Sequence, residues 1–264
     1  MIPKKIHFIF GLKEDEGGKE FSYFHYLNIL SAKRVNPEYE INFYYQHEPR
    51  AYWFQELKKQ EINFIQLDHV EDVLNGIKIS NYAHKADYLR LDVLRKHGGI
   101  YLDTDVICVR PFDDFLKFKC VLGYESINNI TWGLPNFTIL SEPNNPFINL
   151  WYERYREDYH PDNWSYGAVK LPYLLYQENL DLVTTVSSEF FSLYGWDDAS
   201  KYHMFENIGM ITPAYSIHLW ESRWWEELSI INENYLNKIN NTISNLYLKY
   251  SLGYKDIKFN EYWS

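Results

Sequence analysis

Residues 83–106 read AHKADYLRLDVLRKHGGIYLDTDV. The pattern predicts a helix that stops at two glycines, then a short apolar strand, and then two carboxylates one residue apart, Asp103 and Asp105. Side chains at positions i and i+2 of an extended segment point to the same side. We therefore expect both aspartates to converge on one hard divalent cation, whose preferred ligands are oxygens. A cation held at a strand end suits the diphosphate of an activated sugar.

The composition is typical of a globular protein and excludes a disordered chain. Of the 264 residues, 46% are hydrophobic and 23% are charged. The net charge of −10 argues against a nucleic-acid-binding protein, which needs a basic footprint. Aromatic residues reach 19%. Rings with polar edges can form flat faces for sugars and nucleobases, and aromatic packing in the core is the alternative explanation.

The cysteine content and the apolar runs bear on the compartment. Cys108 and Cys120 are too few for a disulfide framework and lack the spacing of a metal site. Cys108 lies in an apolar run, so we expect its thiol to be buried. No signal peptide precedes the first apolar run at residues 6–10, and no apolar stretch approaches the roughly 20 residues of a membrane-spanning helix. We therefore expect a cytoplasmic protein without a transmembrane segment.

Strands and helices alternate in the first half of the chain. The expected strands span residues 6–10, 41–45 and 62–67, and the expected helices between them span residues 21–35 and 51–59. This alternation predicts an α/β fold with a mainly parallel sheet covered on both faces, whose ligands gather beyond the carboxyl ends of the strands. For the second half we expect helices at 147–155 and 169–177 and strands around Ile139, Val183 and Ile208.

No internal repeat or low-complexity linker divides the chain. We therefore expect one catalytic domain over residues 1–225, with a helical tail at 226–264 packed on it. The best-defined element is the helix expected from about Asn81 to His97, which Gly98 and Gly99 terminate. Helical spacing predicts that its core-facing stripe consists of Tyr82, Ala86, Leu89 and Val93.

Several other residues have both a structural and a functional interpretation. Asp87 and Arg90 share a helix face, where spacing alone favours a surface ion pair of little energetic value. His218 lies in a strand-like run, and its imidazole could complete the metal shell that two carboxylates begin. The alternative is a hydrogen-bonded core histidine. Phe10 ends the first strand and could stack on a nucleobase, with core packing as the alternative.

Together these residues resemble glycosyltransferase family 32, the group with a sugar-binding region containing a DXD motif, which is distantly similar to the clostridial glucosylating toxins. The run IPKKIHFIF at residues 2–10 is similar to the opening strand of the family, where Trp often stands in place of Phe10. Residues 86–105 resemble its central block, in which Ala86 replaces a common Ser, and IHLW at 217–220 resembles its closing block. The resemblance spreads from residue 2 to about residue 225.

The resemblance implies a GT-A-type single domain, with a Rossmann-like mixed sheet flanked by helices, and a nucleotide-sugar donor bound with Mn²⁺ or Mg²⁺. It implies that Asp105 binds the metal directly and that Asp103 binds the ribose and the metal. His218 would be a further metal ligand or a diphosphate contact. The donor contacts that it implies are Asp87 and Arg90 at the sugar, Phe10 at the base, and Tyr101 and Trp220 in the pocket. A UDP-hexose is the expected donor.

The same resemblance implies a hexosyltransferase that retains the configuration at the anomeric carbon. Asn136, in LPNF at residues 134–137, is a candidate for the residue beneath that carbon, and a turn residue after Pro135 is the alternative. Apolar and aromatic residues at 131–146 and 196–205 are expected to form the walls of the acceptor site.

The expected acceptor is a carbohydrate or lipid-linked glycan of bacterial surface polysaccharide or lipooligosaccharide. A lipid-linked acceptor would bring the protein to the inner membrane face as a peripheral protein, with the aromatic residues at 220–225 as a contact. An effector that glycosylates a host protein is the first alternative, and the chain lacks the long helical insertions of the clostridial toxins. A nucleotide-sugar binder with a decayed site is a second alternative, and the intact set of site residues argues against it.

Overall fold

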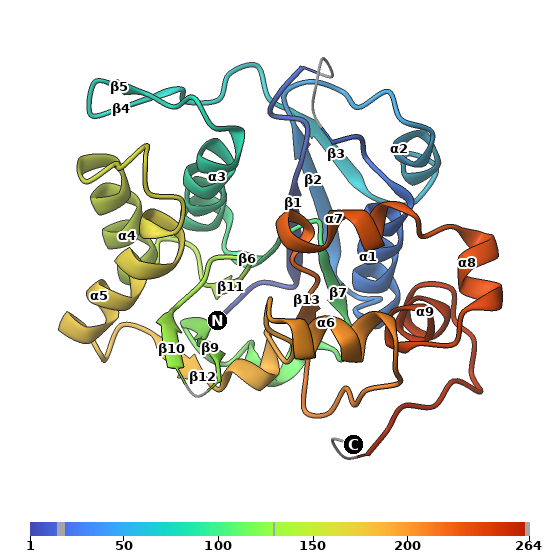
Figure 1. Ribbon diagram of the computed structural model, residues 1–264. Coiled ribbons are helices and arrows are strands. Elements are labelled where there is room, and N and C mark those ends of the chain that lie inside the picture. The colour runs from blue at the N-terminus through green and yellow to red at the C-terminus, as the bar shows by residue number, and fades with distance from the viewer. Residues whose placement is uncertain (15–18, 129, 262–264) are drawn as a thin grey trace.

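The computed structural model describes residues 1–14, 19–128 and 130–261. Its centre is a seven-stranded sheet with the strand order β12-β8-β11-β6-β1-β2-β3 (Figure 1). The strands are β1 (Lys5–Ile9), β2 (Glu40–Tyr45), β3 (Asn63–Gln66), β6 (Gly99–Leu102), β8 (Cys120–Gly123), β11 (Thr138–Ser141) and β12 (Thr184–Val186). Neighbouring strands are parallel except at β11, which runs antiparallel to both β6 and β8. The prediction of an α/β fold with a mostly parallel sheet is therefore confirmed.

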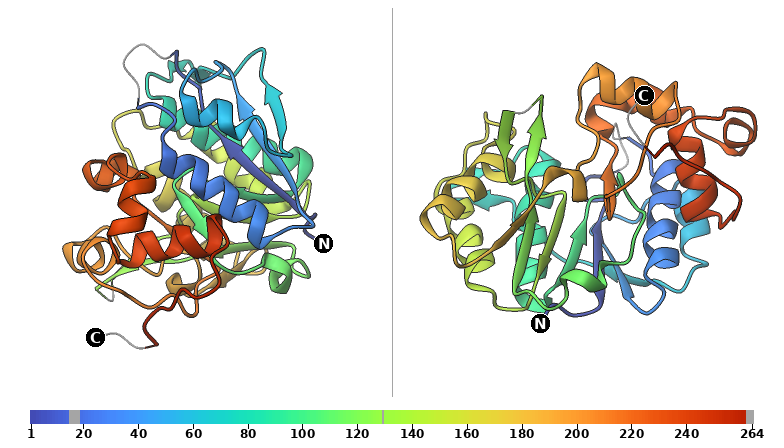
Figure 2. Two further views of the ribbon diagram at one scale, coloured as in Figure 1. Left: turned by 90° about the vertical axis from the view of Figure 1, so that its right-hand side faces the viewer. Right: turned by 90° about the horizontal axis from the view of Figure 1, so that it is seen from below.

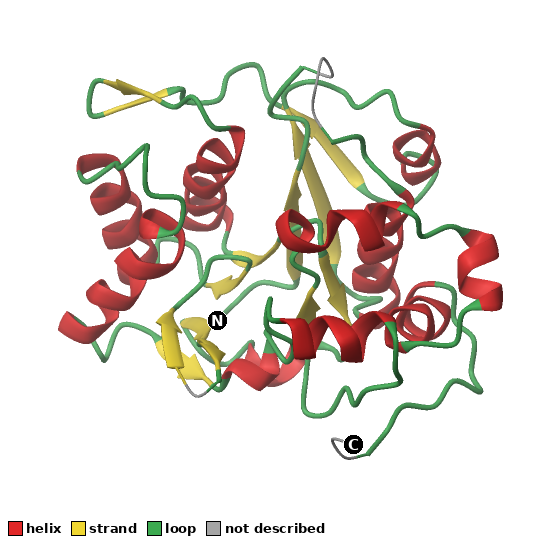
Figure 3. Cartoon of the chain, viewed as in Figure 1, coloured by secondary structure: helices red, strands yellow, loops and turns green. Residues whose placement is uncertain are grey.

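Helices cover both faces of the sheet (Figures 1 and 3). One face carries α1 (Tyr23–Val35) and α2 (Tyr52–Leu57), and the other carries α3 (Tyr82–His97), α4 (Pro146–Glu157) and α5 (Leu171–Glu178). The alternation of side chains along β1 separates the two cores, because Phe8 packs in the cluster that contains residues of α1, while Ile9 packs in the cluster that contains residues of α3.

Shorter elements surround this frame. The two-stranded pairs are β4 (Val73–Leu74) with β5 (Ile77–Lys78), β7 (Val106–Cys108) with β13 (Ser216–His218), and β9 (Glu125–Ile127) with β10 (Ile130–Gly133). The remaining α-helices are α6 (Asp198–Phe205), α7 (Glu221–Ser229), α8 (Glu233–Lys238) and α9 (Thr242–Leu246). Short helical segments of other types are η1 (Phe112–Phe115), η2 (Tyr166–Lys170), η3 (Ser188–Phe190) and η4 (Tyr247–Ser251). Cys108 is fully buried in β7, as expected.

The C-terminal helices lie against the face that α1 covers, as the two views of Figure 2 show. Leu246 and Tyr247 are fully buried and share a hydrophobic cluster with Leu27 of α1. Within the described ranges, no helix has the length and apolar character that crossing a membrane requires.

Two expectations about local structure are wrong. Residues 207–215 contain no strand, although one was expected around Ile208, because polar contacts hold this segment instead: the Gly209 N–H donates to Thr242 Oγ1 at 2.7 Å. The core-facing stripe of α3 is also displaced, because Tyr82 is 48% exposed and Ala86 and Leu89 are only half-buried. The buried residues of this helix are His84, Asp87, Tyr88, Arg90, Leu91, Val93 and Leu94.

Close packing explains the two glycines that end α3. Gly98 has φ of 61° and Gly99 has φ of 100°, conformations that L side chains rarely adopt. A Cβ on Gly99 would lie 2.7 Å from the Lys5 carbonyl oxygen of β1. The glycines therefore allow the chain to pass directly from the helix into β6, which runs beside β1.

Candidate active site

Asp103, Thr104 and Asp105 form a turn directly after β6, and not the extended segment that the sequence suggested. The Val106 N–H donates to the Asp103 carbonyl oxygen at 3.0 Å, which closes the turn. Asn28 of α1 donates from Nδ2 to the Thr104 carbonyl oxygen at 2.9 Å, which fixes the turn against α1. Strand alternation therefore does not bring the two carboxylates together, and the expected convergence occurs within the turn instead.

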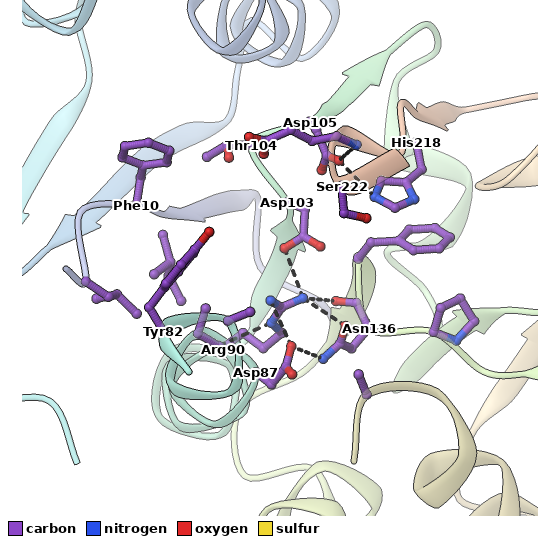
Figure 4. A pocket seen from close by; sticks show the side chains of 18 of the residues that line it. Phe10, Tyr82, Asp87, Arg90, Asp103, Thr104, Asp105, Asn136, His218 and Ser222 are labelled. Atoms are coloured by element: carbon purple, nitrogen blue, oxygen red, sulfur yellow. Dashed lines mark hydrogen bonds and ion pairs between the residues drawn. The ribbon is translucent and has the colours of Figure 1, made fainter. Parts of the chain in front are cut away.

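The turn brings its two carboxylates to His218 (Figure 4). His218 is opposite Val106 in the pairing of β13 with β7, so its ring lies next to the turn. Ligand atoms of Asp103, Asp105 and His218 all lie within 4.8 Å of one another. Two carboxylates and an imidazole provide the oxygen and nitrogen ligands that suit a divalent metal ion.

Asp105 is ionised and firmly positioned. Its side chain accepts a hydrogen bond from the Glu221 N–H at 2.8 Å, at the first residue of α7, and its Oδ2 lies 3.2 Å from His218 Nε2. Burial by itself would raise the pKa of Asp105, but His218 and the Glu221 N–H outweigh it and lower the pKa to about 2. The carboxylate therefore carries its negative charge at neutral pH.

His218 is held by its neighbours on both sides. Its ring stacks on Phe137 with 4.2 Å between centroids, and its centroid lies 4.3 Å from that of Trp220. Burial lowers the pKa of His218, but Asp105, Asp103 and Glu125 raise it more, so the net shift is upward. Among the described residues, nothing forms a hydrogen bond with Nδ1 of this buried ring.

Asp87 and Arg90 form a buried ion pair, and the interpretation as a surface pair is wrong. Arg90 is 4% exposed, and its Nη2 lies 3.1 Å from Asp87 Oδ1. Asn136 donates from Nδ2 to the same carboxylate oxygen at 2.8 Å and accepts from Arg90 Nη1, through both its carbonyl oxygen and Oδ1, at 2.9 Å. Asn136 thus closes a network rather than serving only as a turn residue after Pro135.

Asp103 connects this network to the turn. Its Oδ1 lies 2.9 Å from Arg90 Nη1 and accepts a hydrogen bond from the Tyr101 hydroxyl at 2.7 Å. The Arg90 guanidinium also lies over the ring of Tyr101, 4.4 Å from its centroid. Burial raises the pKa of Asp103 more than Arg90 lowers it.

All nine residues proposed singly as catalytic, donor-binding or metal-binding line one pocket of about 320 Å³, whereas the expected acceptor wall at 196–205 does not line it. They are Phe10, Asp87, Arg90, Tyr101, Asp103, Asp105, Asn136, His218 and Trp220. A volume of this size lies at the lower end of the range for small-molecule sites. Phe10 is half-buried and meets the ring of Phe21 edge to face at 5.2 Å, so part of it faces the pocket and part of it packs in the core. Packing of Phe10 in the core is therefore confirmed in part, and stacking on a nucleobase stays a prediction.

The closing segment is packed more tightly than an exposed aromatic patch would be. Trp220 and Trp224 are buried, and the Trp220 indole N–H donates to the Tyr194 carbonyl oxygen at 2.8 Å. These two rings therefore offer no exposed surface for a membrane contact. Trp220 has φ of 50° and ψ of 50°, the left-handed conformation, and this turn directs the Glu221 N–H toward Asp105.

The sequence interpretation missed several charged residues of the pocket, and Lys19 and Glu125 are two of them. Lys19 donates from Nζ to the Glu221 carbonyl oxygen at 3.2 Å and lies over the ring of Trp225. Glu125 begins β9 and is 7% exposed. Regular spacing in the sequence does not indicate either residue. Only the tertiary structure brings them to the pocket.

Residues 22–122 match the family model described as "Glycosyltransferase sugar-binding region containing DXD motif". The chain is 31% identical over 258 residues to Glucan organizing enzyme 1 of Cryptococcus neoformans, with 90% of this chain and 70% of that protein covered. It is 38% identical over 89 residues to toxin Afp18 of Yersinia ruckeri, a match that covers 32% of this chain and 4% of the toxin.

The fold resembles that of a solved glycosyltransferase. The crystal structure of the glycosyltransferase GlyE of Streptococcus pneumoniae superposes with a TM-score of 0.52 and 15% identity, covering 96% of this chain and 61% of that one. This likeness concerns the fold alone, and the fold is of the GT-A type, with helices on both faces of a mixed sheet.

Proposed function

This chain belongs to the glycosyltransferases whose sugar-binding region contains a DXD motif, and we propose that it moves a hexose from a UDP-sugar to a hydroxyl group of a carbohydrate acceptor. The observation that carries this proposal is the juxtaposition of two groups in one pocket. A possible metal site, Asp103, Asp105 and His218, lies beside a closed polar network of Asp87, Arg90 and Asn136.

The residues of the first group fit a divalent cation. Two carboxylates and an imidazole favour Mn²⁺ or Mg²⁺, and the buried His218 Nδ1 has no hydrogen-bond partner among the described residues. We propose that these three residues hold the ion. When bound, such an ion acts as a Lewis acid that offsets the negative charge on the departing diphosphate.

The second group would orient the donor. Arg90 keeps Asp87 and Asn136 in fixed positions, and all three residues line the pocket. Fixed polar groups of this kind stabilise a developing charge without having to reorganise during the reaction. We propose that Asp87 and Arg90 hydrogen-bond the hydroxyls of the hexose, that Asn136 lies beneath the anomeric carbon, and that Phe10, Tyr101 and Trp220 line the nucleotide end.

The proposed transfer retains the anomeric configuration. The acceptor oxygen forms a bond to the anomeric carbon on the face from which the diphosphate leaves, the bond from that carbon to the phosphate oxygen breaks, and the acceptor proton passes to the departing diphosphate. This front-face route requires no enzymic nucleophile. Its requirement is that donor and acceptor are held in contact while water is excluded.

The acceptor that we propose is a glycan, of the kind built into bacterial surface polysaccharide or lipooligosaccharide. The relative that this chain matches over most of its length is named for glucan, which supports a carbohydrate acceptor. The toxin match favours a second candidate, glycosylation of a protein, but it extends over only a third of the chain. The breadth of the first match makes the glycan the better proposal.

A donor panel tests the proposed function. The protein is incubated with UDP- and GDP-hexoses, with Mn²⁺ or with a chelator, and the released nucleoside diphosphate is measured without an acceptor. We expect slow, metal-dependent hydrolysis of a UDP-hexose, together with a rise in the unfolding temperature when UDP and Mn²⁺ are added. A protein that releases no nucleotide from any donor and gains no thermal stability would exclude a nucleotide-sugar transferase.

A further inference from the structure

Glu125 is a buried carboxylate of the pocket that the donor network does not use. It is 7% exposed, lies at the first position of β9, and lines the same pocket as Asp105 and His218. Among the described residues, the one hydrogen bond to its side chain is a long one, from the Trp196 indole N–H at 3.4 Å. Burying a carboxylate is costly unless strong donors reach it, so a group with this little compensation indicates an external donor.

Aromatic rings lie beside this carboxylate. Trp196 meets Trp132 edge to face, with 5.7 Å between ring centroids, and Trp132 is 50% exposed. Arg223 of α7 lies over the ring of Trp196 at 5.2 Å, which keeps that ring in place. A carboxylate next to a partly exposed indole face is a combination that fits a pyranose, because the ring C–H groups contact the indole and a hydroxyl donates to the carboxylate.

The hairpin that carries these groups is firmly attached to the pocket wall. Gly133 pairs with Glu125, and the register of the hairpin shifts between Thr131 and Gly133, which places Trp132 at the irregularity. A Cβ on Gly133 would lie 2.4 Å from the Val169 carbonyl oxygen, so β10 contacts η2 at backbone distance. Irregularities of this kind redirect a side chain. The hairpin therefore holds Trp132 in a defined relation to Glu125, which lines the pocket.

We propose that Glu125, Trp132 and Trp196 form the acceptor subsite, in which an uncharged pyranose packs on Trp132 and its reacting hydroxyl donates a hydrogen bond to the Glu125 carboxylate. The proposal rests on the proposed function and names the substrate class of that site. It also joins the two segments expected to form the acceptor walls, 131–146 and 196–205, at the contact between the two tryptophans.

Glu125 orients the acceptor and keeps its own charge throughout the reaction. As the acceptor oxygen bonds to the anomeric carbon, its proton passes to the departing diphosphate. The Glu125 carboxylate therefore takes up no proton in this step. A protein hydroxyl is the competing acceptor class, and the experiment includes it.

The experiment compares transfer with hydrolysis in the same reaction. Wild type, Glu125→Gln, Trp132→Ala and Glu178→Gln receive a UDP-hexose, Mn²⁺ and either a panel of methyl and p-nitrophenyl hexopyranosides or a peptide library containing serine and threonine. Glu178 is exposed at the end of α5 and serves as the matched control for loss of one carboxylate. Total released UDP and glycosylated product are both measured.

We expect the ratio of transfer to hydrolysis to fall about tenfold in Glu125→Gln, as loss of a charged hydrogen bond to the reacting hydroxyl predicts. For Trp132→Ala we expect a rise of about tenfold in the acceptor KM, because its half-exposed ring contributes contact area and not core packing. Glu178→Gln should match the wild type. A smaller amount of folded protein alone would lower the rates of transfer and hydrolysis together and leave their ratio unchanged.

Other results would overturn the inference. If both variants keep the wild-type ratio and acceptor KM while wild type hydrolyses the donor, the acceptor subsite lies elsewhere and the proposed function stands. If the peptide hydroxyls accept the hexose and no glycoside does, the carbohydrate acceptor is wrong. A wild type that hydrolyses no donor would remove the proposed function, and this inference with it.

Discussion

Asp87 and Asp105 are both buried aspartates of one pocket, yet their surroundings differ. Asp87 has the Arg90 guanidinium against it and accepts a hydrogen bond from Asn136. Asp105 has a second aspartate nearby, and the groups that compensate its charge are a histidine and one backbone N–H. The first region is a closed scaffold and the second an acidic cluster. In the function that we propose, the first region orients a neutral sugar and the second attracts a cation.

The largest effect is expected at the acidic cluster. Asp105→Asn keeps the size of the side chain and an oxygen for the Glu221 N–H but removes the charge that the cation requires. We expect Mn²⁺-dependent release of nucleotide to fall about 10³-fold, the loss found when a main electrostatic contact to the reaction is removed.

The matched control for this variant is Asp113→Asn, since Asp113 is half-exposed and pairs with Lys4 on the surface. Its activity should equal that of the wild type. Metal-dependent turnover of Asp105→Asn within tenfold of wild type would place the cation elsewhere and remove the contrast between the two regions.

The next effect is expected in the stability of the closed network. Arg90→Met leaves Asp87 and Asp103 without their buried cation, which should cost about 3 kcal/mol or more of the free energy of unfolding. Lys96→Met, on the same helix, breaks an exposed pair with Asp92 and should cost less than about 1 kcal/mol. Urea denaturation of the two variants measures the difference. Equal losses would show that the network is not the closed scaffold described above.

The smallest effect is expected at His218, the histidine of the acidic cluster. His218→Asn removes one nitrogen ligand and leaves both carboxylates, so we expect Mn²⁺ to bind about tenfold more weakly. Mn²⁺ binding can be followed by the electron paramagnetic resonance of the free ion, independently of activity. The exposed His97 provides the control, as His97→Asn. An unchanged Mn²⁺ affinity of His218→Asn would exclude His218 from the cation site.

Much of the frame was predictable from periodicity. The first three strands and the helices between them lie within two residues of the expected bounds, because local apolar patterns specify them. The core-facing stripe of α3 was not predictable, because a rule based on hydrophobic periodicity counts charged residues as exposed. Asp87 and Arg90 are buried because each compensates the other and Asn136, distant in sequence, completes the network. The burial of this network therefore depends on the tertiary structure and not on the local sequence.

The site was predictable to a similar extent. Its metal-ligand candidates could be read from the sequence, because the two aspartates follow a recognisable strand and the histidine lies in a run that resembles a family block. Strand alternation does not explain their convergence, because hydrogen bonds from Val106 and Asn28 hold the two aspartates in a turn. Glu125 and Lys19 could not be found this way, since only the tertiary structure brings them to the pocket.

The reversed direction of β11 has a consequence for how the pocket is assembled. Parallel strands such as β1 and β6 present their last residues at one edge of the sheet, whereas an antiparallel strand presents its first residues there. Asn136, two positions before β11 begins, thereby lies at the edge where Asp103 follows β6, and the Asp103 N–H donates to the Phe137 carbonyl oxygen at 2.9 Å. Had this strand run the other way, the same asparagine would have stood at the opposite rim, roughly 13 Å off at 3.3 Å per residue. The polarity of one backbone segment is as necessary for the chemistry as any side chain it delivers.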